Sequence, residues 1–193
     1  CNQKKLINYV AYCHRHINYT QKFKSIIDSG KIGKIFNIVI RWGSYLPDWH
    51  PWEDYRTFYM AKKDQGGGAL LDESHGIDLL RFIFGEVDEV FAVVDQISNL
   101  EISADDHAFL TLRLKNKSLA QISFDLNARY TFCKIEATGE NGTAIWDRVE
   151  HNIKIYDADK KKWETESYTR DDFLNMYPNQ TQHYINCIEG KSK

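Results

Sequence analysis

Apolar and polar residues alternate along the second half of the chain, which is the pattern of strands that bury one face. Two segments carry an apolar residue at every second position: Ala108, Leu110, Leu112, Leu114, Ala120, Ile122, Phe124 and Leu126. Further along, Glu140-Asn141-Gly142 is typical of a hairpin turn. The pattern predicts an antiparallel sheet with strands near residues 89–94, 107–115, 119–127, 133–139, 143–146 and 153–156. One face of this sheet is expected to lie in the core.

The first half of the chain and its last residues carry mainly helical patterns. One helix is predicted to begin at Asn18 and to stop at Gly30, with an apolar stripe formed by Phe23, Ile26 and Ile27. The other expected elements are a helix running into a strand at 6–11, a strand at 35–42, a helix from 66–68 to 84 and a last helix at 179–189. Helices combined with an antiparallel sheet indicate an α+β fold.

The overall charge excludes two classes of partner. The chain has 193 residues, and its 25 Lys and Arg against 27 Asp and Glu leave a net charge of −2. Without a basic face, nucleic acids and anionic membranes are poor partners. No apolar run approaches the roughly 20 residues of a membrane span, so we expect a soluble, cytoplasmic protein. The cysteines Cys1, Cys13, Cys133 and Cys187 are scattered, so neither a disulfide framework nor a zinc site is expected.

The helix predicted after the glycine triplet at 66–68 carries the strongest chemical signal. Asp72 and His75 would lie about 60° apart on one face of a continuous helix, since each residue turns the helix by about 100°. A carboxylate there can orient an imidazole for general acid/base catalysis. The alternative is a structural pair in the core or a helix cap. The glycines do not form a nucleotide-binding fingerprint and instead favour a close backbone approach.

A long aromatic segment from Gly43 to Gln65 has no clear period and is predicted to be a binding loop. Tyrosine and tryptophan rings can pack against a hydroxylated ligand, while charged and imidazole groups can fix its hydroxyls. The candidate substrate-binding residues are Asp48, Trp49, His50, Tyr55 and Arg56. The alternative is a loop that its aromatic side chains merely anchor to the body of the protein.

Metal binding is a weaker interpretation. His14-Arg15-His16 places two imidazoles close together, but no third ligand is nearby in the sequence. A zinc-dependent hydrolase using His50, Asp72 and His75 would draw its ligands from one loop and one helix, without a recognised spacing. We therefore expect no metal site.

Four segments, in their order and spacing, resemble the carboxy-terminal part of the glucose-fructose oxidoreductase/inositol dehydrogenase/MocA-like family. They are residues 10–15, 26–30, 32–35 and the segment from the glycine triplet to 87. The resemblance runs over nearly the whole chain. It implies an open, mainly antiparallel sheet with helices on one face, like the carboxy-terminal domains of dihydrodipicolinate reductase and glyceraldehyde-3-phosphate dehydrogenase.

The resemblance also implies how the chain is organised. Family members pair a Rossmann domain that holds NAD or NADP with an α+β domain that supports the substrate site. By this resemblance, residues 1–15 are a remnant of the last helix-strand unit of the Rossmann domain. Residues 16–193 are then the substrate and oligomerisation domain, without its final helix. The glycine-rich fingerprint and the catalytic lysine of the family have no counterpart here, so we interpret the chain as a fragment that is inactive alone.

The resemblance assigns roles to particular residues. His75 matches the family's acid/base histidine and Asp72 the aspartate before it, although in many members the histidine follows the aspartate by four positions, where in this chain it follows by three. Tyr12 and Arg15 fall on the cofactor side of the cleft. The loop at 49–51 is similar to that of members associated with sugar metabolism.

Two functions follow as expectations. The first is hydride transfer between NAD or NADP, bound mainly by the absent domain, and a secondary alcohol of a sugar or sugar-like substrate. The second is a non-catalytic module that forms homo-oligomers through one sheet face, for which Phe109, Ile135 and Trp146 are the candidate contacts.

Overall fold

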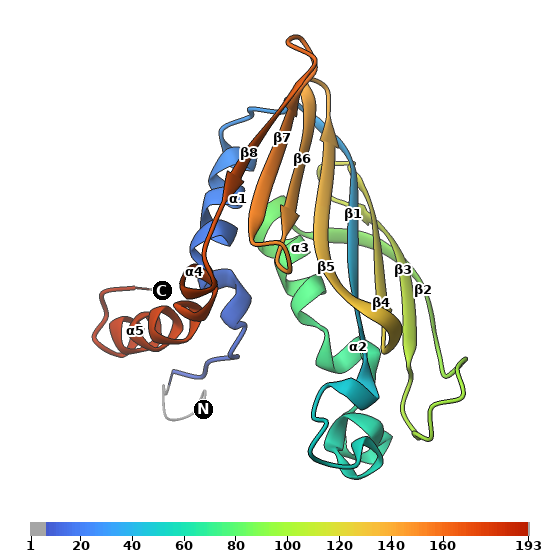
Figure 1. Ribbon diagram of the computed structural model, residues 1–193. Helices are drawn as coiled ribbons and strands as arrows, with labels where there is room; N and C mark the ends of the chain where they lie inside the picture. Colours follow the sequence, from blue (N-terminus) through green and yellow to red (C-terminus); the bar gives the residue numbers. More distant parts are fainter. Residues whose placement is uncertain (1–6, 193) are drawn as a thin grey trace.

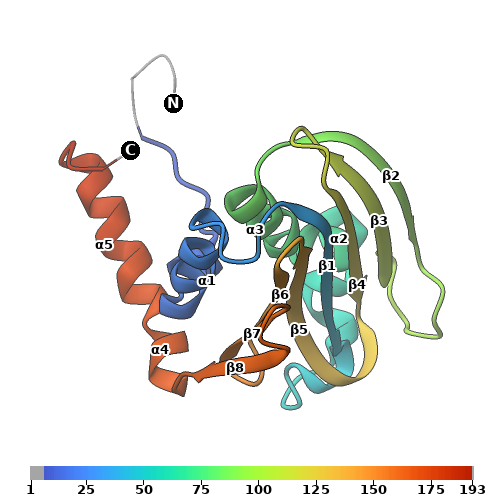
Figure 2. The ribbon, with the colours of Figure 1, turned by 90° about the horizontal axis from the view of Figure 1, so that it is seen from above.

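The computed structural model describes residues 7–192, which form one open, curved sheet with helices on one side (Figures 1 and 2). The strands lie in the order β2-β3-β4-β1-β5-β6-β7-β8. Their bounds are β1 Ile35–Tyr45, β2 Val87–Asp95, β3 His107–Leu114, β4 Leu119–Asp125, β5 Asn127–Gly139, β6 Gly142–Asp147, β7 Asn152–Asp157 and β8 Lys162–Ser167. The predicted α+β class and the mainly antiparallel sheet are confirmed.

The strand β1 occupies the middle of the sheet. It pairs in parallel with β4, while the other neighbouring pairs among the described strands are antiparallel. Ile40 lies opposite Ile122 on one side and Ile135 on the other, and all three side chains are buried. The alternation seen in the sequence therefore marks the face of the sheet that lies against the helices.

Helices α1 (Asn18–Asp28) and α3 (His75–Phe84) cover that face. Phe23 and Ile26 of α1 and the apolar residues of α3 enter the same core as the strand residues. Gly30 ends α1 with a φ of 71°, the left-handed conformation that glycine adopts readily. The other helices are α2 (Ala69–Asp72), α4 (Arg170–Leu174) and α5 (Met176–Ile188). The helix α5 packs against the 3-10 turn Cys13–His16 and lies away from the sheet (Figure 2).

Among residues 7–192, no helix covers the outer face of the sheet (Figure 2). Phe109 is exposed there, as predicted, next to Val93 and Phe91 of the edge strand β2. The prediction was wrong for Ile135 and Trp146, which are buried in the core. They occupy the helix-facing positions of β5 and β6, where they lie opposite each other.

Three further elements differ from the sequence-based prediction. Residues 7–11 form no strand, and Leu6 lies outside the described residues. The strand β8 was missed because all six of its residues are exposed, so no alternation marks it. The helix α4 was also missed, although Thr169 and Asp172 form a capping box at its start. Among the described residues, no helix has the length and apolar character that crossing a membrane requires.

Candidate functional site

The helix predicted from the glycine triplet to Phe84 is interrupted at its chemically important point. Asp72 ends α2 and His75 begins α3, with Glu73 and Ser74 between them. The angular spacing of a continuous helix therefore does not apply across this break. Tyr59 Oη donates a hydrogen bond to Asp72 Oδ1, and no hydrogen bond joins Asp72 to His75. The prediction that these two residues pair directly on one helical face was wrong.

The glycine triplet lets α2 begin against an acidic loop residue. A Cβ atom on Gly68, whose φ is 114°, would lie 2.4 Å from Asp105 Oδ1. The backbone carbonyl of Asp105 accepts a hydrogen bond from Ala69 N, and its carboxylate accepts one from Leu70 N, each at 2.9 Å. These bonds satisfy amide groups that would otherwise be unpaired at the start of the helix. The close backbone approach expected at the triplet is therefore confirmed.

His75 lies on a stack of rings that three distant segments bring together. The ring of His14 stacks on Trp42 of β1, with 4.9 Å between centroids, and His75 stacks on His14 at 4.4 Å. Tyr12 meets His75 edge-on at 5.6 Å. Trp42 and His14 are only 3% and 5% exposed, while His75 is half-buried. The stack fixes the plane of the His75 imidazole at the surface of the core.

Burial keeps both imidazoles of the stack uncharged. It lowers the pKa of His14 well below the ordinary value, and the charges of His75 and Arg148 lower it further. Burial also lowers the pKa of His75; Arg148 adds to this effect, while the charges of Asp78 and Asp72 oppose it. Within residues 7–192, neither Nδ1 atom has a hydrogen-bond partner. At neutral pH, His75 is therefore an imidazole that can accept a proton.

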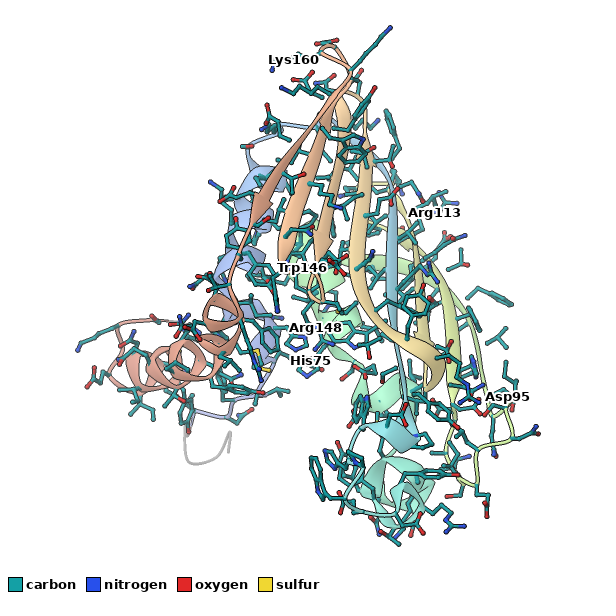
Figure 3. All side chains as sticks on the ribbon, viewed as in Figure 1. His75, Asp95, Arg113, Trp146, Arg148 and Lys160 are labelled. Atoms are coloured by element: carbon teal, nitrogen blue, oxygen red, sulfur yellow. The ribbon has the colours of Figure 1, made fainter. Side chains whose placement is uncertain are left out.

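The remaining ionisable groups next to the stack include one buried acid and one cation. Glu73 is 4% exposed, and burial together with the charge of Asp72 raises its pKa to about 8, although Arg148 acts in the opposite direction. Burial raises the pKa of the Cys133 thiol to about 12. Arg148 lies close to His75 in Figure 3, in the turn between β6 and β7. Around His75, the acid and the thiol are thus held in their protonated forms and the arginine carries the charge.

The segment before α1 is clamped to α3 by an ion pair. Arg15 Nε and Nη2 donate to the carboxylate of Asp78 at 2.7 Å and 2.5 Å, and Asp78 is buried. Its hydrogen bond to Asp78 raises the pKa of Arg15. Arg15 and Tyr12 also line a cavity of about 770 Å³ between this segment, α3 and α5. His75 does not line that cavity, and Tyr12 is the residue that contacts both.

The predicted binding loop folds into short 3-10 turns and makes most of its polar contacts within itself. Asp48 is exposed, whereas Trp49 packs against the core. His50 Nδ1 lies 2.6 Å from Glu53 Oε1. Tyr55 Oη accepts a hydrogen bond from the backbone of a neighbouring loop at 3.2 Å. The structure thus draws Trp49, His50 and Tyr55 into contacts that hold the loop together.

Arg56 is also engaged. Its guanidinium lies 2.7 Å from Asp54 of the same loop and 3.4 Å from Glu101 of the neighbouring loop between β2 and β3, so its charge is compensated. The contact from this loop to the helix pair comes instead from Tyr59, through Asp72. The sequence did not single out Tyr59, because nothing in its neighbourhood distinguishes it from the other aromatic residues of the loop.

The described residues give no support to a metal-dependent interpretation. No group of three or more His, Cys, Asp or Glu side chains within 7–192 is arranged to hold a metal ion. His14 is stacked in the core, and His16 Nε2 lies 3.0 Å from Tyr9 Oη. Cys13, Cys133 and Cys187 are free thiols.

Comparison with known proteins agrees with this architecture. The sequence matches the family described as the GFO/IDH/MocA C-terminal domain over residues 20–145. Among curated proteins, the chain is similar to the putative oxidoreductase YteT of Bacillus subtilis (strain 168). The two are 27% identical over 84 residues, which cover 43% of this chain and 19% of that protein.

Solved structures share the fold. A levoglucosan dehydrogenase in complex with NADH has a TM-score of 0.73 at 20% identity, and the match covers 86% of this chain and 48% of that one. The WlbA dehydrogenase from Bordetella pertussis, in complex with NADH and UDP-GlcNAcA, has a TM-score of 0.73 at 21% identity. The match covers 100% of this chain and 57% of that one. An oxidoreductase from Agrobacterium radiobacter has a TM-score of 0.78 at 16% identity, and the match covers 100% of this chain and 58% of that one.

The extent of these matches decides what they establish. The chain spans about half the length of the solved relatives and about a fifth of the curated one. At such identities, the likeness to solved structures concerns the fold. The family match, in contrast, runs over more than half of the sequence and includes α3 and the central strand β1. The chain therefore belongs to the GFO/IDH/MocA C-terminal domain family.

Proposed function

We propose that the enzyme containing this domain transfers a hydride between NAD or NADP and a secondary alcohol of a sugar or sugar-like substrate. The observation that carries the proposal is the environment of His75, whose half-buried imidazole is held uncharged and makes no hydrogen bond within residues 7–192. The fold relatives lend support: they include a levoglucosan dehydrogenase with bound NADH and WlbA with NADH and UDP-GlcNAcA.

In this proposal, His75 takes the proton of the substrate hydroxyl during oxidation and returns it during reduction. The imidazolium that forms is favoured by the charges of Asp72 and Asp78, since both raise the pKa of His75. Asp72 thus contributes through its charge, and the hydrogen bond from Tyr59 holds its carboxylate in place. The loop residues Asp48, Trp49, His50, Tyr55 and Arg56 remain candidates for contact with the sugar.

The described residues fit part of a nicotinamide cofactor. The cavity beside Tyr12 and Arg15 offers an aromatic ring, which suits a stacked ring, while the charge of Arg15 is paired with Asp78. The sequence has no glycine-rich fingerprint that could hold the whole dinucleotide, so we assign the rest of it to a Rossmann domain outside this chain. A bound nicotinamide supplies the site that accepts or donates the hydride.

The test is a His75→Ala variant of the full-length enzyme, assayed with NAD and NADP against a panel of sugars. We expect kcat/KM to fall by about 100-fold or more, because an acid/base group contributes about 10² to 10⁴ in rate. The acid limb of the pH profile, which the low pKa of His75 places below about pH 6.5, should disappear, and added imidazole should restore part of the rate.

The control for this variant is its thermal unfolding curve, which should match that of the wild type. Turnover within about threefold of wild type, with an unchanged pH profile, contradicts the role of His75.

We also propose that the outer face of the sheet forms a homo-oligomer. Phe91, Val93 and Phe109 are exposed side by side on β2 and β3, and the cross-strand pairing joins Val93 directly to Phe109. Apolar side chains clustered on a strand pair at the sheet edge are typical of an interface.

A further inference from the structure

Arg148 is held in a fixed position beside the ring stack. Its backbone N donates a hydrogen bond to Cys133 O at 2.9 Å, and its backbone carbonyl accepts one from Tyr19 Oη at 3.4 Å. The turn that carries it is stabilised by the buried Asp147, whose Oδ1 accepts hydrogen bonds at 3.0 Å from Val149 N and Glu150 N. The side chain of Arg148 therefore extends from a turn that these hydrogen bonds hold in place. Figure 3 shows it next to His75.

Aromatic rings support the guanidinium. Its Cζ lies 5.0 Å from the ring centroid of Trp42 and 5.8 Å from that of Phe173 in α4. Trp42 also stacks with His75, at 6.1 Å between centroids. One ring thus contacts both the cation and the proposed acid/base group. A ligand bound at Arg148 would lie within the length of a small molecule of His75.

Within residues 7–192, the guanidinium of Arg148 forms no salt bridge. No carboxylate within residues 7–192 lies within 4.0 Å of its guanidinium, and residues 1–6 contain no acidic side chain. Arg15, Arg56 and Arg81, in contrast, each bind a carboxylate. Glu73 feels the charge of Arg148, but burial keeps that acid mostly protonated at neutral pH. Within residues 7–192, Arg148 is therefore a cation beside His75 without a salt-bridge partner.

We propose that Arg148 binds an oxyanion of the substrate, so that the sugar handled at His75 carries a carboxylate or a phosphate. This inference rests on the proposed function. A planar guanidinium binds such groups through two parallel hydrogen bonds, and partial burial makes these bonds stronger than in water. In this proposal, the rings of Trp42 and Phe173 hold the plane of the guanidinium, and the N–H donors that do not face the Cys133 thiol bind the ligand.

The first test compares matched sugars in the full-length enzyme with its cofactor. The pairs are D-glucose with D-glucuronate, D-galactose with D-galacturonate, and D-glucose with D-glucose 6-phosphate. We expect kcat/KM of the wild type to favour a charged member by about 30-fold or more, because bidentate charge-assisted bonds are worth about that factor. The preferred pair distinguishes a carboxylate from a phosphate.

Two substitutions assign this preference to Arg148. Arg148→Met should raise KM for the charged sugar by about 10- to 100-fold, while kcat for both sugars and KM for the neutral one change by less than about threefold. Arg148→Lys should recover part of the loss, because lysine keeps the positive charge but lacks the two parallel N–H donors of the guanidinium. The control is Arg41→Met. Arg41 also lies over an aromatic ring, that of Phe132, but on the outer face of the sheet. Equal loss for both members of a pair, or preference for the neutral one, overturns the proposal.

A second test does not depend on catalysis. Inorganic phosphate and acetate are titrated into the protein at constant ionic strength while tryptophan fluorescence is recorded, since Trp42 lies under the cation. We expect a saturable change that Arg148→Met and Trp42→Phe both remove and Arg41→Met retains. The absence of saturable binding contradicts the anion site. If anions bind but no sugar is oxidised or reduced, the proposed function fails and the anion site stands.

Discussion

A pKa shifted by burial is the property that His14, His75 and Glu73 share. It keeps the two imidazoles deprotonated and the carboxyl group protonated, so none of them carries a full charge at neutral pH. His75 differs from the other two because it is half-buried. A proton can therefore reach His75 at a smaller desolvation cost, while its neighbours stay uncharged.

Glu73 leads to a prediction about stability and pH. Its pKa is about 8 in the folded chain and near the ordinary 4.5 once unfolded, so the unfolded state releases the proton first as pH rises. The free energy of unfolding should then fall between about pH 4.5 and 8, by at most about 1.4 kcal/mol per pH unit from this group, and level off above. Glu73→Gln should remove this dependence, and urea unfolding of both proteins at pH 5 and pH 8 measures it.

The control for that experiment is Glu140→Gln, which replaces an exposed acid in the β5–β6 turn. Its stability should follow the wild-type pH curve. If Glu73→Gln also runs parallel to the wild type, the buried carboxyl is ionised in the folded state and the interpretation is wrong.

Sequence reasoning found His75, Asp72 and, through the family resemblance, Tyr12, but not the ring stack and the cation beside His75. The glycine triplet and the apolar helix marked His75, whereas Trp42, His14 and Arg148 come from three other segments. Nothing local identifies these residues as neighbours. Trp42 follows Ile38 and Ile40 in the buried alternation of β1, so the sequence indicated which face of the sheet it occupies. Its neighbours could not be predicted without knowing the order of the strands.

Among the elements, the helix pair α2 and α3 shows how packing overrides a periodic pattern. The apolar residues from 69 to 84 suit one long helix, yet α2 is fixed at its start by Asp105 and α3 by contact with the sheet. The strands were predicted well wherever one face is buried. The exposed strand β8 could not be predicted from alternation, because its place depends on pairing with β7 alone.

A substitution at Gly76 tests how closely α3 approaches the sheet. A Cβ at this position would lie 2.7 Å from Cε1 of the Phe124 ring, which is fully buried in β4. Gly76→Ala should lower the free energy of unfolding by about 1–3 kcal/mol, even though alanine favours a helix, because a packed ring cannot move freely. Leu71→Ala, at an exposed position of α2, is the control and should change stability by less than about 0.5 kcal/mol. A Gly76→Ala protein as stable as the wild type would mean that α3 can shift.

For the whole molecule, the proposed interface on the outer face predicts a change of mass. Phe91 and Phe109 are 69% and 51% exposed, and lysine at either position should dissociate the oligomer because a charge would be buried without a partner. Sedimentation velocity measures the outcome. Val90→Lys is the control: Val90 is equally exposed on β2 but points to the opposite side, and its variant should keep the oligomer. A monomeric wild type, or no effect of either phenylalanine variant, contradicts the proposal.

The central place of β1 also governs how the chain can be made. Ile40 is synthesised long before Ile122 and Ile135, the residues on either side of it. At roughly 5–20 residues per second, a ribosome needs about 5 to 20 seconds to supply both neighbours. For that time the nascent chain displays an apolar strand with two unpaired edges, which is the kind of segment that aggregates readily before its partners are made.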